Sequence, residues 1–218
     1  MTRWFTADCH YIHPNIIKYT HRPQLKTGDL NEDGSWVSNE VAHLRAEQMN
    51  EMLMRESNQR VKPEDSVICV GDFACRGGEK GVMGSKAKPG EILKKLNGHW
   101  TIVSGNHDVQ NGVKPLCEFM SCEMGNYHVG VQHIPLYDSK FPPQKYLSER
   151  RKKFLEDHSR YCADYFDFMI CGHVHDAWKV KKVAGIWHVN VGVDVCRYMP
   201  INDVEVMLIY EKALKGVL

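Results

Sequence analysis

The sequence predicts a single α/β domain whose reactive side chains lie at the ends of its strands. Short apolar runs alternate along the chain with longer segments of helical periodicity. The apolar runs at residues 4–7, 66–70, 100–103 and 166–171 are each followed closely by Asp, Asn or His residues. In α/β folds, ligands bind at the carboxyl ends of the strands, so we expect these polar residues to form one shared site.

The individual elements follow from local patterns. Strands are predicted at residues 4–7, 66–70, 100–103, 127–132, 166–171 and 186–191. Ser38 can cap a helix that reaches about Arg60. The core face of this helix is predicted from helical spacing to contain Val41, Leu44, Met49, Met52 and Leu53. Pro89 starts a short helix ending before Gly98, and residues 203–214 form the last helix.

The length of 218 residues corresponds to one domain, spanning residues 1–218. The polar segment 140–164, with its charge run at 149–153, is predicted to be a surface helix or an insertion, and could form a cap over the site. The sequence does not determine the oligomeric state.

Charge and cysteine content restrict the partners and the compartment. The 28 Lys and Arg residues nearly balance the 27 Asp and Glu residues, so nucleic acid is not a favoured partner, although a small nucleotide remains compatible. Neither a secretion signal nor an apolar run of about 20 residues is found, so no membrane association is expected. The eight cysteines form no CxxC pair, which favours a reduced, cytoplasmic protein.

Five short blocks contain the residues with metal-binding chemistry. In chain order they are Asp8-Cys9-His10, Gly71-Asp72, Gly105-Asn106-His107-Asp108, His133 and Gly172-His173-Val174-His175. Side chains two apart on a strand point to the same side, so the first and last blocks could each place two ligands in one cavity. The glycines mark positions where the backbone turns sharply or approaches closely. Each block alone is more often structural, but the ordered set of five predicts a site for Mn, Fe, Zn or Ni.

The five blocks, in this order, resemble the calcineurin-like metallophosphoesterase superfamily from Asp8 to His175. The segments 8–13 and 190–194 resemble its small bacterial and phage members. The resemblance implies a four-layer α/β/β/α sandwich with the metal site at the strand C-terminal ends. It also implies two divalent metal ions, manganese foremost. The implied ligands of the first ion are Asp8, His10, Asp72 and His175. Those of the second are Asp72, Asn106, His133 and His173, with Asp72 bridging.

The resemblance further implies hydrolysis of a small phosphate ester by a metal-bridging hydroxide. His107 would be the general acid and Asp108 would orient it. Arg76 and His13 are candidate substrate contacts, although a solvated loop arginine and a histidine that caps a helix before Pro14 are equally good interpretations.

Phosphodiesters or nucleotides are slightly favoured, since no loop clearly offers the several cations that suit a dianionic monoester. The alternative is a nuclease acting on DNA or RNA with the same centre, for which a basic groove is expected. A protein phosphatase is disfavoured because Cys75 stands where those enzymes carry Asp. An inactive scaffold is disfavoured because His107 and all seven ligand residues are present.

Overall fold

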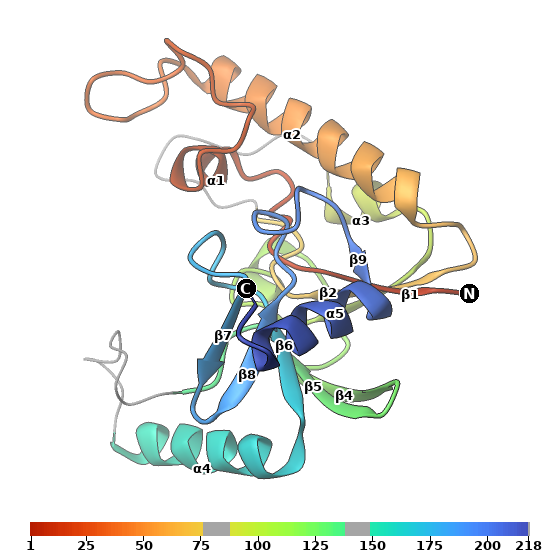
Figure 1. Ribbon diagram of the computed structural model, residues 1–218. Coiled ribbons are helices and arrows are strands. Elements are labelled where there is room, and N and C mark those ends of the chain that lie inside the picture. Colours follow the sequence, from red (N-terminus) through yellow and green to blue (C-terminus); the bar gives the residue numbers. More distant parts are fainter. Residues whose placement is uncertain (76–87, 138–148, 218) are drawn as a thin grey trace.

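The computed structural model describes residues 1–75, 88–137 and 149–217, which form two β-sheets between layers of helices (Figure 1). The first sheet has the order β3-β2-β1-β9 and comprises β1 (Arg3–Thr6), β2 (Ser66–Val70), β3 (His99–Val103) and β9 (Ile201–Asn202). The second has the order β4-β5-β6-β8-β7 and comprises β4 (Phe119–Met124), β5 (Tyr127–Gln132), β6 (Phe168–Cys171), β7 (Val180–Val183) and β8 (Ile186–Asn190).

Three strands in each sheet run parallel. In the first sheet these are β1, β2 and β3, with Phe5 paired to Ile68. In the second they are β5, β6 and β8, with Ile170 paired to Val189. An isolated parallel bridge between Ala7 and Gly192 links the two sheets just beyond β1 and β8. All six predicted strands are therefore confirmed, while the antiparallel edge strands β4, β7 and β9 were not predicted.

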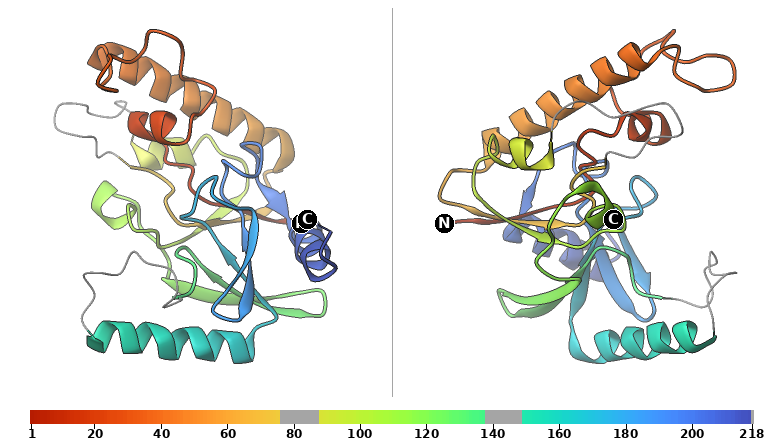
Figure 2. Two further views of the ribbon diagram at one scale, coloured as in Figure 1. Left: turned by 60° about the vertical axis from the view of Figure 1, so that its left-hand side comes forward. Right: turned by 180° about the vertical axis from the view of Figure 1, so that it is seen from behind.

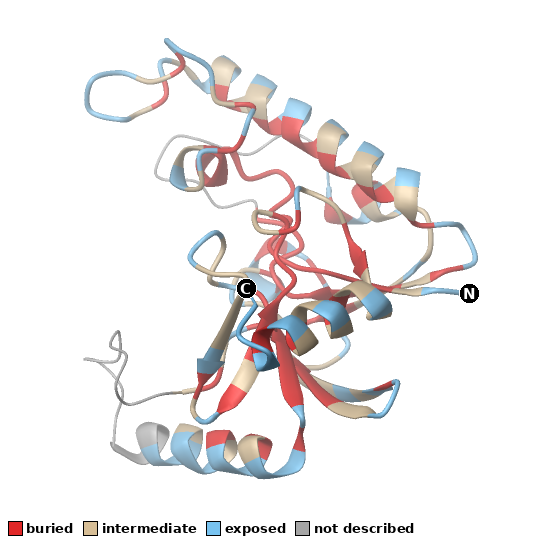
Figure 3. Cartoon of the chain, in the orientation of Figure 1, coloured by how far each residue is buried: buried red, intermediate tan, exposed pale blue. Residues whose placement is uncertain are grey.

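The main core lies between the two sheets and follows from the two-residue period of the strands. Ile68 and Val70 of β2 point into it, whereas Cys69 points to the opposite face. In β6, Phe168 and Ile170 point into it and Met169 points outward. Buried residues accordingly concentrate on the central strands (Figure 3).

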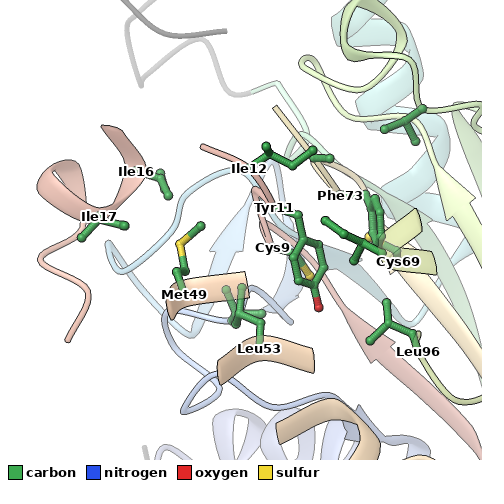
Figure 4. Packing of buried hydrophobic residues seen from close by; sticks show 14 of the residues in the cluster. Cys9, Tyr11, Ile12, Ile16, Ile17, Met49, Leu53, Cys69, Phe73 and Leu96 are labelled. Carbon is green, nitrogen blue, oxygen red and sulfur yellow. The ribbon is translucent and has the colours of Figure 1, made fainter. Parts of the chain in front are cut away.

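Helices cover the outer faces of both sheets, which confirms the four-layer arrangement (Figure 2). The first sheet is covered by α1 (Pro14–Tyr19), α2 (Asn39–Arg60) and α3 (Pro89–Leu93). Met49 and Leu53 of α2 pack there in one cluster with Tyr11 and Cys69 (Figure 4). The second sheet is covered by α4 (Glu149–Tyr165), and α5 (Asp203–Leu214) closes the side of the core between the sheets. Every helix in the described ranges is too short or too polar to cross a bilayer.

Two predictions about the helices have clear outcomes. Ser38 does cap α2, because its side chain accepts a hydrogen bond from the Val41 amide. The predicted core face is wrong at Leu44, whose side chain is 48% exposed, since the buried face instead includes Ala42 and Ala46. Small alanines let α2 lie close to its neighbours, and a search for large apolar residues overlooks them. The helix α4 falls within the predicted surface segment, of which residues 140–148 lie outside the described residues.

A pair of substitutions on α2 tests this assignment of the buried face. Met49→Ala removes a fully buried side chain and should lower the free energy of unfolding by about 2–5 kcal/mol. Leu44→Ala, on the exposed face, should change it by no more than about 0.5 kcal/mol. Urea denaturation of both variants measures the difference, and equal losses would contradict the observed orientation of α2.

Candidate metal centre

The polar blocks lie just beyond the carboxyl ends of the parallel strands. Asp8 follows β1, Asp72 follows β2 and Asn106 follows β3. In the second sheet, His133 directly follows β5 and His173 follows β6. Because these strands run parallel to their neighbours within each sheet and the two sheets face each other, these residues from distant parts of the chain converge.

The convergence produces two groups of side chains that could each hold a metal ion. One group contains Asp8, His10 and His175, and the other contains Asp72, His133 and His173. Within each group the ligand atoms all lie within 4.8 Å of one another. The Asp72 Oδ2 atom lies between the groups, 3.5 Å from His10 Nε2 and 3.2 Å from His133 Nε2.

Asn106 adds an amide oxygen to the second group. Its Oδ1 atom lies 3.2 Å from His133 Nε2 and 3.0 Å from His173 Nδ1. The structure thus brings together all seven residues selected from the sequence as metal ligands. The donor set of carboxylate, imidazole and amide oxygens suits borderline divalent ions.

The backbone that presents these ligands is strained. Of the ten non-glycine residues with positive φ in the described part of the chain, five are Asp8, His10, Asp72, His173 and His175. The strand alternation expected to align the first and last blocks is therefore not the cause of their convergence. These residues lie past the strand ends, and left-handed turns aim their side chains instead.

The glycines before three of the blocks are required by close approach. A Cβ atom on Gly71 would overlap the His133 ring, and one on Gly105 would overlap the Asp72 carboxylate. A Cβ atom on Gly172 would overlap Ala7 and the Asp8 carboxylate. The sequence-based expectation of close backbone approach at these glycines is confirmed.

His107 lies beside the first group and is also tied to Asp72. Its amide donates a hydrogen bond to Asp72 Oδ1 at 2.9 Å, and its ring centroid lies 5.3 Å from that of His10. Its Nδ1 atom lies 3.7 Å from the Cys75 Sγ atom. The His107 ring therefore lies beside His10 of the first ligand group.

Asp108 makes contacts different from the expected one with the His107 ring. Its buried carboxylate accepts hydrogen bonds from the amides of Asp72, Phe73 and Gly105 at 2.8–2.9 Å. A buried carboxylate needs several donors, and these three backbone groups supply them. Asp108 therefore fixes the loops that carry Asp72 and Asn106.

Of the two candidate substrate contacts, His13 and Arg76, the structure describes His13. His13 is 8% exposed, and its ring centroid lies 5.4 Å from that of His10 and 6.3 Å from that of His107. It occupies the N-cap position of α1, but its side chain makes no capping hydrogen bond. With His10 and Cys75 it forms a third group that could hold a metal. Arg76 lies outside the described residues.

Two residues that support the site were missed. Asp194 accepts hydrogen bonds from Arg22 Nε at 2.9 Å and Nη2 at 3.1 Å, and its Oδ2 atom lies 2.9 Å from His175 Nδ1. Arg22 also donates to the carbonyl oxygens of Asp8 and Cys9. Such partners orient metal-binding histidines and raise their basicity. Asp194 belongs to the 190–194 segment that carried part of the resemblance, whereas no sequence pattern marks Arg22.

Burial and pairing shift the protonation of the ligands. Burial raises the pKa of Asp8 to about 6. Burial alone would lower the pKa of His133, but its hydrogen bond to Asp72 and the charges of Asp8 and Asp72 raise it to about 9. Burial lowers the pKa of His10 well below its ordinary value, so its ring is neutral near pH 7. Within the described residues, neither ring nitrogen of His10 has a hydrogen-bond partner. Such buried, unpartnered nitrogens fit a ligand for a cation.

Comparison with known proteins agrees with this geometry. The family model of the calcineurin-like phosphoesterase superfamily domain matches residues 43–209. The chain belongs to the calcineurin-like phosphoesterase superfamily. It is therefore a metal-dependent hydrolase acting on phosphate esters. The matched range begins after Asp8 and His10, which the fold nevertheless places against its residues.

Two relatives span nearly the whole chain. The uncharacterized protein MJ1445 of Methanocaldococcus jannaschii is 28% identical over 212 residues, which is 94% of this chain and 90% of the relative. The crystal structure of protein AQ665 of unknown function, from Aquifex aeolicus, has a TM-score of 0.61 and 22% identity. The structural match covers 95% of this chain and 98% of the AQ665 chain. The fold shared with protein AQ665 thus covers 95% of this chain.

The Arg22–Asp194 pair should affect both stability and metal affinity. Asp194→Asn leaves the buried Arg22 charge uncompensated and should lower the free energy of unfolding by about 3 kcal/mol. It should also weaken metal binding by about 10–100-fold, because His175 loses its anionic partner. Urea denaturation and calorimetric titration with manganese measure the two effects. Asp164→Asn, at an exposed position of α4, is the control and should change neither.

Metal binding to this phosphoesterase should release protons. His133, with its pKa raised to about 9, is protonated in the metal-free protein at pH 7.5, but a ligand nitrogen must be neutral. Metal affinity should therefore rise with pH up to about 9, and fall further below about 6 as Asp8 becomes protonated. Calorimetric titrations at pH 7.5 in buffers of different ionisation enthalpy count the released protons. A heat independent of the buffer would contradict the assignment of His133 as a ligand.

Proposed function

We propose that this phosphoesterase binds two divalent metal ions, manganese foremost, and hydrolyses phosphodiesters or nucleotides. The observation that supports two ions is the position of the Asp72 carboxylate between the two ligand groups. One carboxylate has two oxygen atoms and can be shared between two neighbouring cations. Asn106 would add a further ligand to the second group, and His10 would be one of the ligands of the first group.

Each residue of the site then has a distinct task. The bound ions would neutralise charge on the phosphate and lower the pKa of a water molecule that attacks it. His107 borders the site and would donate a proton to the departing oxygen. Asp108 would hold the Asp72 and Gly105 backbones in place, so its task is positioning. His13, beside His10 and His107, would contact the substrate or its leaving group.

The preference for diesters is supported by where the cations of the described chain are engaged. Arg22 is buried and fully used by Asp194 and two backbone carbonyls. The cavity that adjoins Asn106 and His133 has no Lys or Arg among its described lining residues. A phosphomonoester dianion would have few additional positive partners there. A diester carries one negative charge fewer and therefore needs fewer such partners. The same shortage weighs against a nuclease that tracks a polyanion.

The eight free cysteines fit a cytoplasmic location.

Turnover of bis-p-nitrophenyl phosphate tests the proposal. The purified protein should hydrolyse it with added manganese, lose activity after treatment with a chelator, and regain it with fresh metal. His107→Asn should lower kcat by about 10²–10⁴-fold while metal content stays unchanged, because only a proton donor is lost. Asp72→Asn should lower both kcat and the number of bound metal ions.

A matched control and a substrate panel complete the test. His99→Asn makes the same substitution at an exposed position at the start of β3, and should leave kcat unchanged. Nucleotide monophosphates, cyclic nucleotides, dinucleotides and oligonucleotides, each supplied with manganese, distinguish the substrate classes. Unchanged turnover in His107→Asn, together with two metal ions retained by Asp72→Asn, would refute the proposed centre.

A further inference from the structure

A cavity of about 600 Å³ adjoins the second ligand group and has no task in the proposed chemistry. Asn106 and His133 line one end of it, so the cavity is continuous with the proposed metal centre. Small-molecule sites in proteins have volumes of roughly 300–1,000 Å³. The space is much larger than a phosphate group needs, so the rest of a substrate could fill it.

The walls of the cavity are mainly apolar and aromatic. They come from the segment after β5, from the beginning of β4 and from the middle part of α4. The side chains that define its character are Phe119, Leu136, Tyr137, Phe154, Leu155 and His158. The rings of Phe119 and His158 meet edge to face with centroids 5.7 Å apart, and Phe154 lies parallel to His158 at 6.5 Å. Aromatic walls of this kind favour a flat, polarisable guest.

The polar groups of the cavity are largely engaged with each other. Gln132 Oε1 lies 3.0 Å from His158 Nε2, and the Ser159 hydroxyl accepts a hydrogen bond from the Tyr137 amide. Burial lowers the pKa of His158, which keeps its ring neutral near pH 7. Apart from His133 of the candidate metal centre, the charged side chain among the described lining residues is the exposed Glu118, which disfavours an anionic guest.

We propose that this cavity binds an uncharged aromatic group attached to the phosphate, and so selects aryl-bearing organic phosphates as substrates. The proposal rests on the proposed function, because the phosphate itself would be held by the metal centre. The aromatic ring would lie in the cavity. Asn106 and His133 would lie at the end of the cavity that adjoins the metal centre. Leu155 and Phe154 of α4 would then be specificity-determining residues.

Binding of simple phosphonates to the manganese-loaded protein tests the proposal without any leaving group. Burying a benzyl ring should make benzylphosphonate bind about tenfold more tightly than methylphosphonate. Cyclohexylmethylphosphonate, similar in size but not aromatic, should bind about threefold more weakly than benzylphosphonate. Isothermal titration calorimetry gives the three dissociation constants. Equal affinity for the methyl and benzyl compounds would overturn the proposal, and equal affinity for the benzyl and cyclohexylmethyl compounds would overturn its aromatic character.

Substitutions on α4 locate the binding site. Leu155→Trp should fill the cavity and reduce the preference for benzyl over methyl to about one, leaving the affinity for methylphosphonate unchanged. Glu156→Trp introduces the same side chain at the exposed neighbouring position and should leave the preference intact. Phe154→Ala removes a side chain that is 57% exposed, so the fold should tolerate it, and should reduce the preference about threefold.

These outcomes separate the two proposals. If no phosphonate binds and no phosphate ester is turned over, the proposed function itself fails. If methylphosphonate binds and the reference diester is hydrolysed, but the benzyl preference persists unchanged in folded Leu155→Trp and in Phe154→Ala, the cavity assignment alone is overturned.

Discussion

The buried ion pair between Arg22 and Asp194 holds together segments on which the rest of the site depends. The guanidinium binds the Asp194 carboxylate on one side and the carbonyl oxygens of Asp8 and Cys9 on the other. Asp194 in turn lies against His175. The segments after β1, β6 and β8 are therefore linked through one planar cation, whose five donors suit several acceptors at once. Arg22 thus adds a buried side-chain link to the backbone hydrogen bonds that already join these segments.

The second structural requirement is a backbone held in unfavourable conformations. Each left-handed residue costs about 1–2 kcal/mol, and five of the site residues adopt this conformation. Hydrogen bonds from the Asp8 and His10 amides to the carbonyls of Gly71 and Asp72 fix two of them. The amide of His173 donates to the Asp8 carboxylate and fixes a third. The strained conformations are therefore held by contacts within the folded chain itself.

Most of the fold and the residues of the candidate metal centre were predictable because they depend on strong local signals. Apolar runs or alternating patterns marked the six parallel strands, and the five blocks contain the seven residues that converge in the candidate metal centre. The edge strands β7 and β9 are short, and β7 contains two lysines, so neither has an apolar run to detect. Arg22 has its role only through contacts with residues more than 170 positions away or on a neighbouring loop. Asp108 was correctly placed near the site, but its acceptor role depends on three backbone amides that only the folded chain brings together.

The helix α4 is divided along its length between two different environments. Near its end, Cys162 packs together with Phe166, which directly follows the helix, against Met169 of the sheet, while Leu155 and His158 in its middle part border the cavity. None of the seven ligand residues lies on it. Mutations that accumulate in this part of α4 during evolution can thus remodel the cavity while the candidate metal centre and the central core stay intact. Under the proposed role of the cavity, divergence of substrate choice among descendants of this protein needs only a handful of nucleotide changes in one short stretch of the gene.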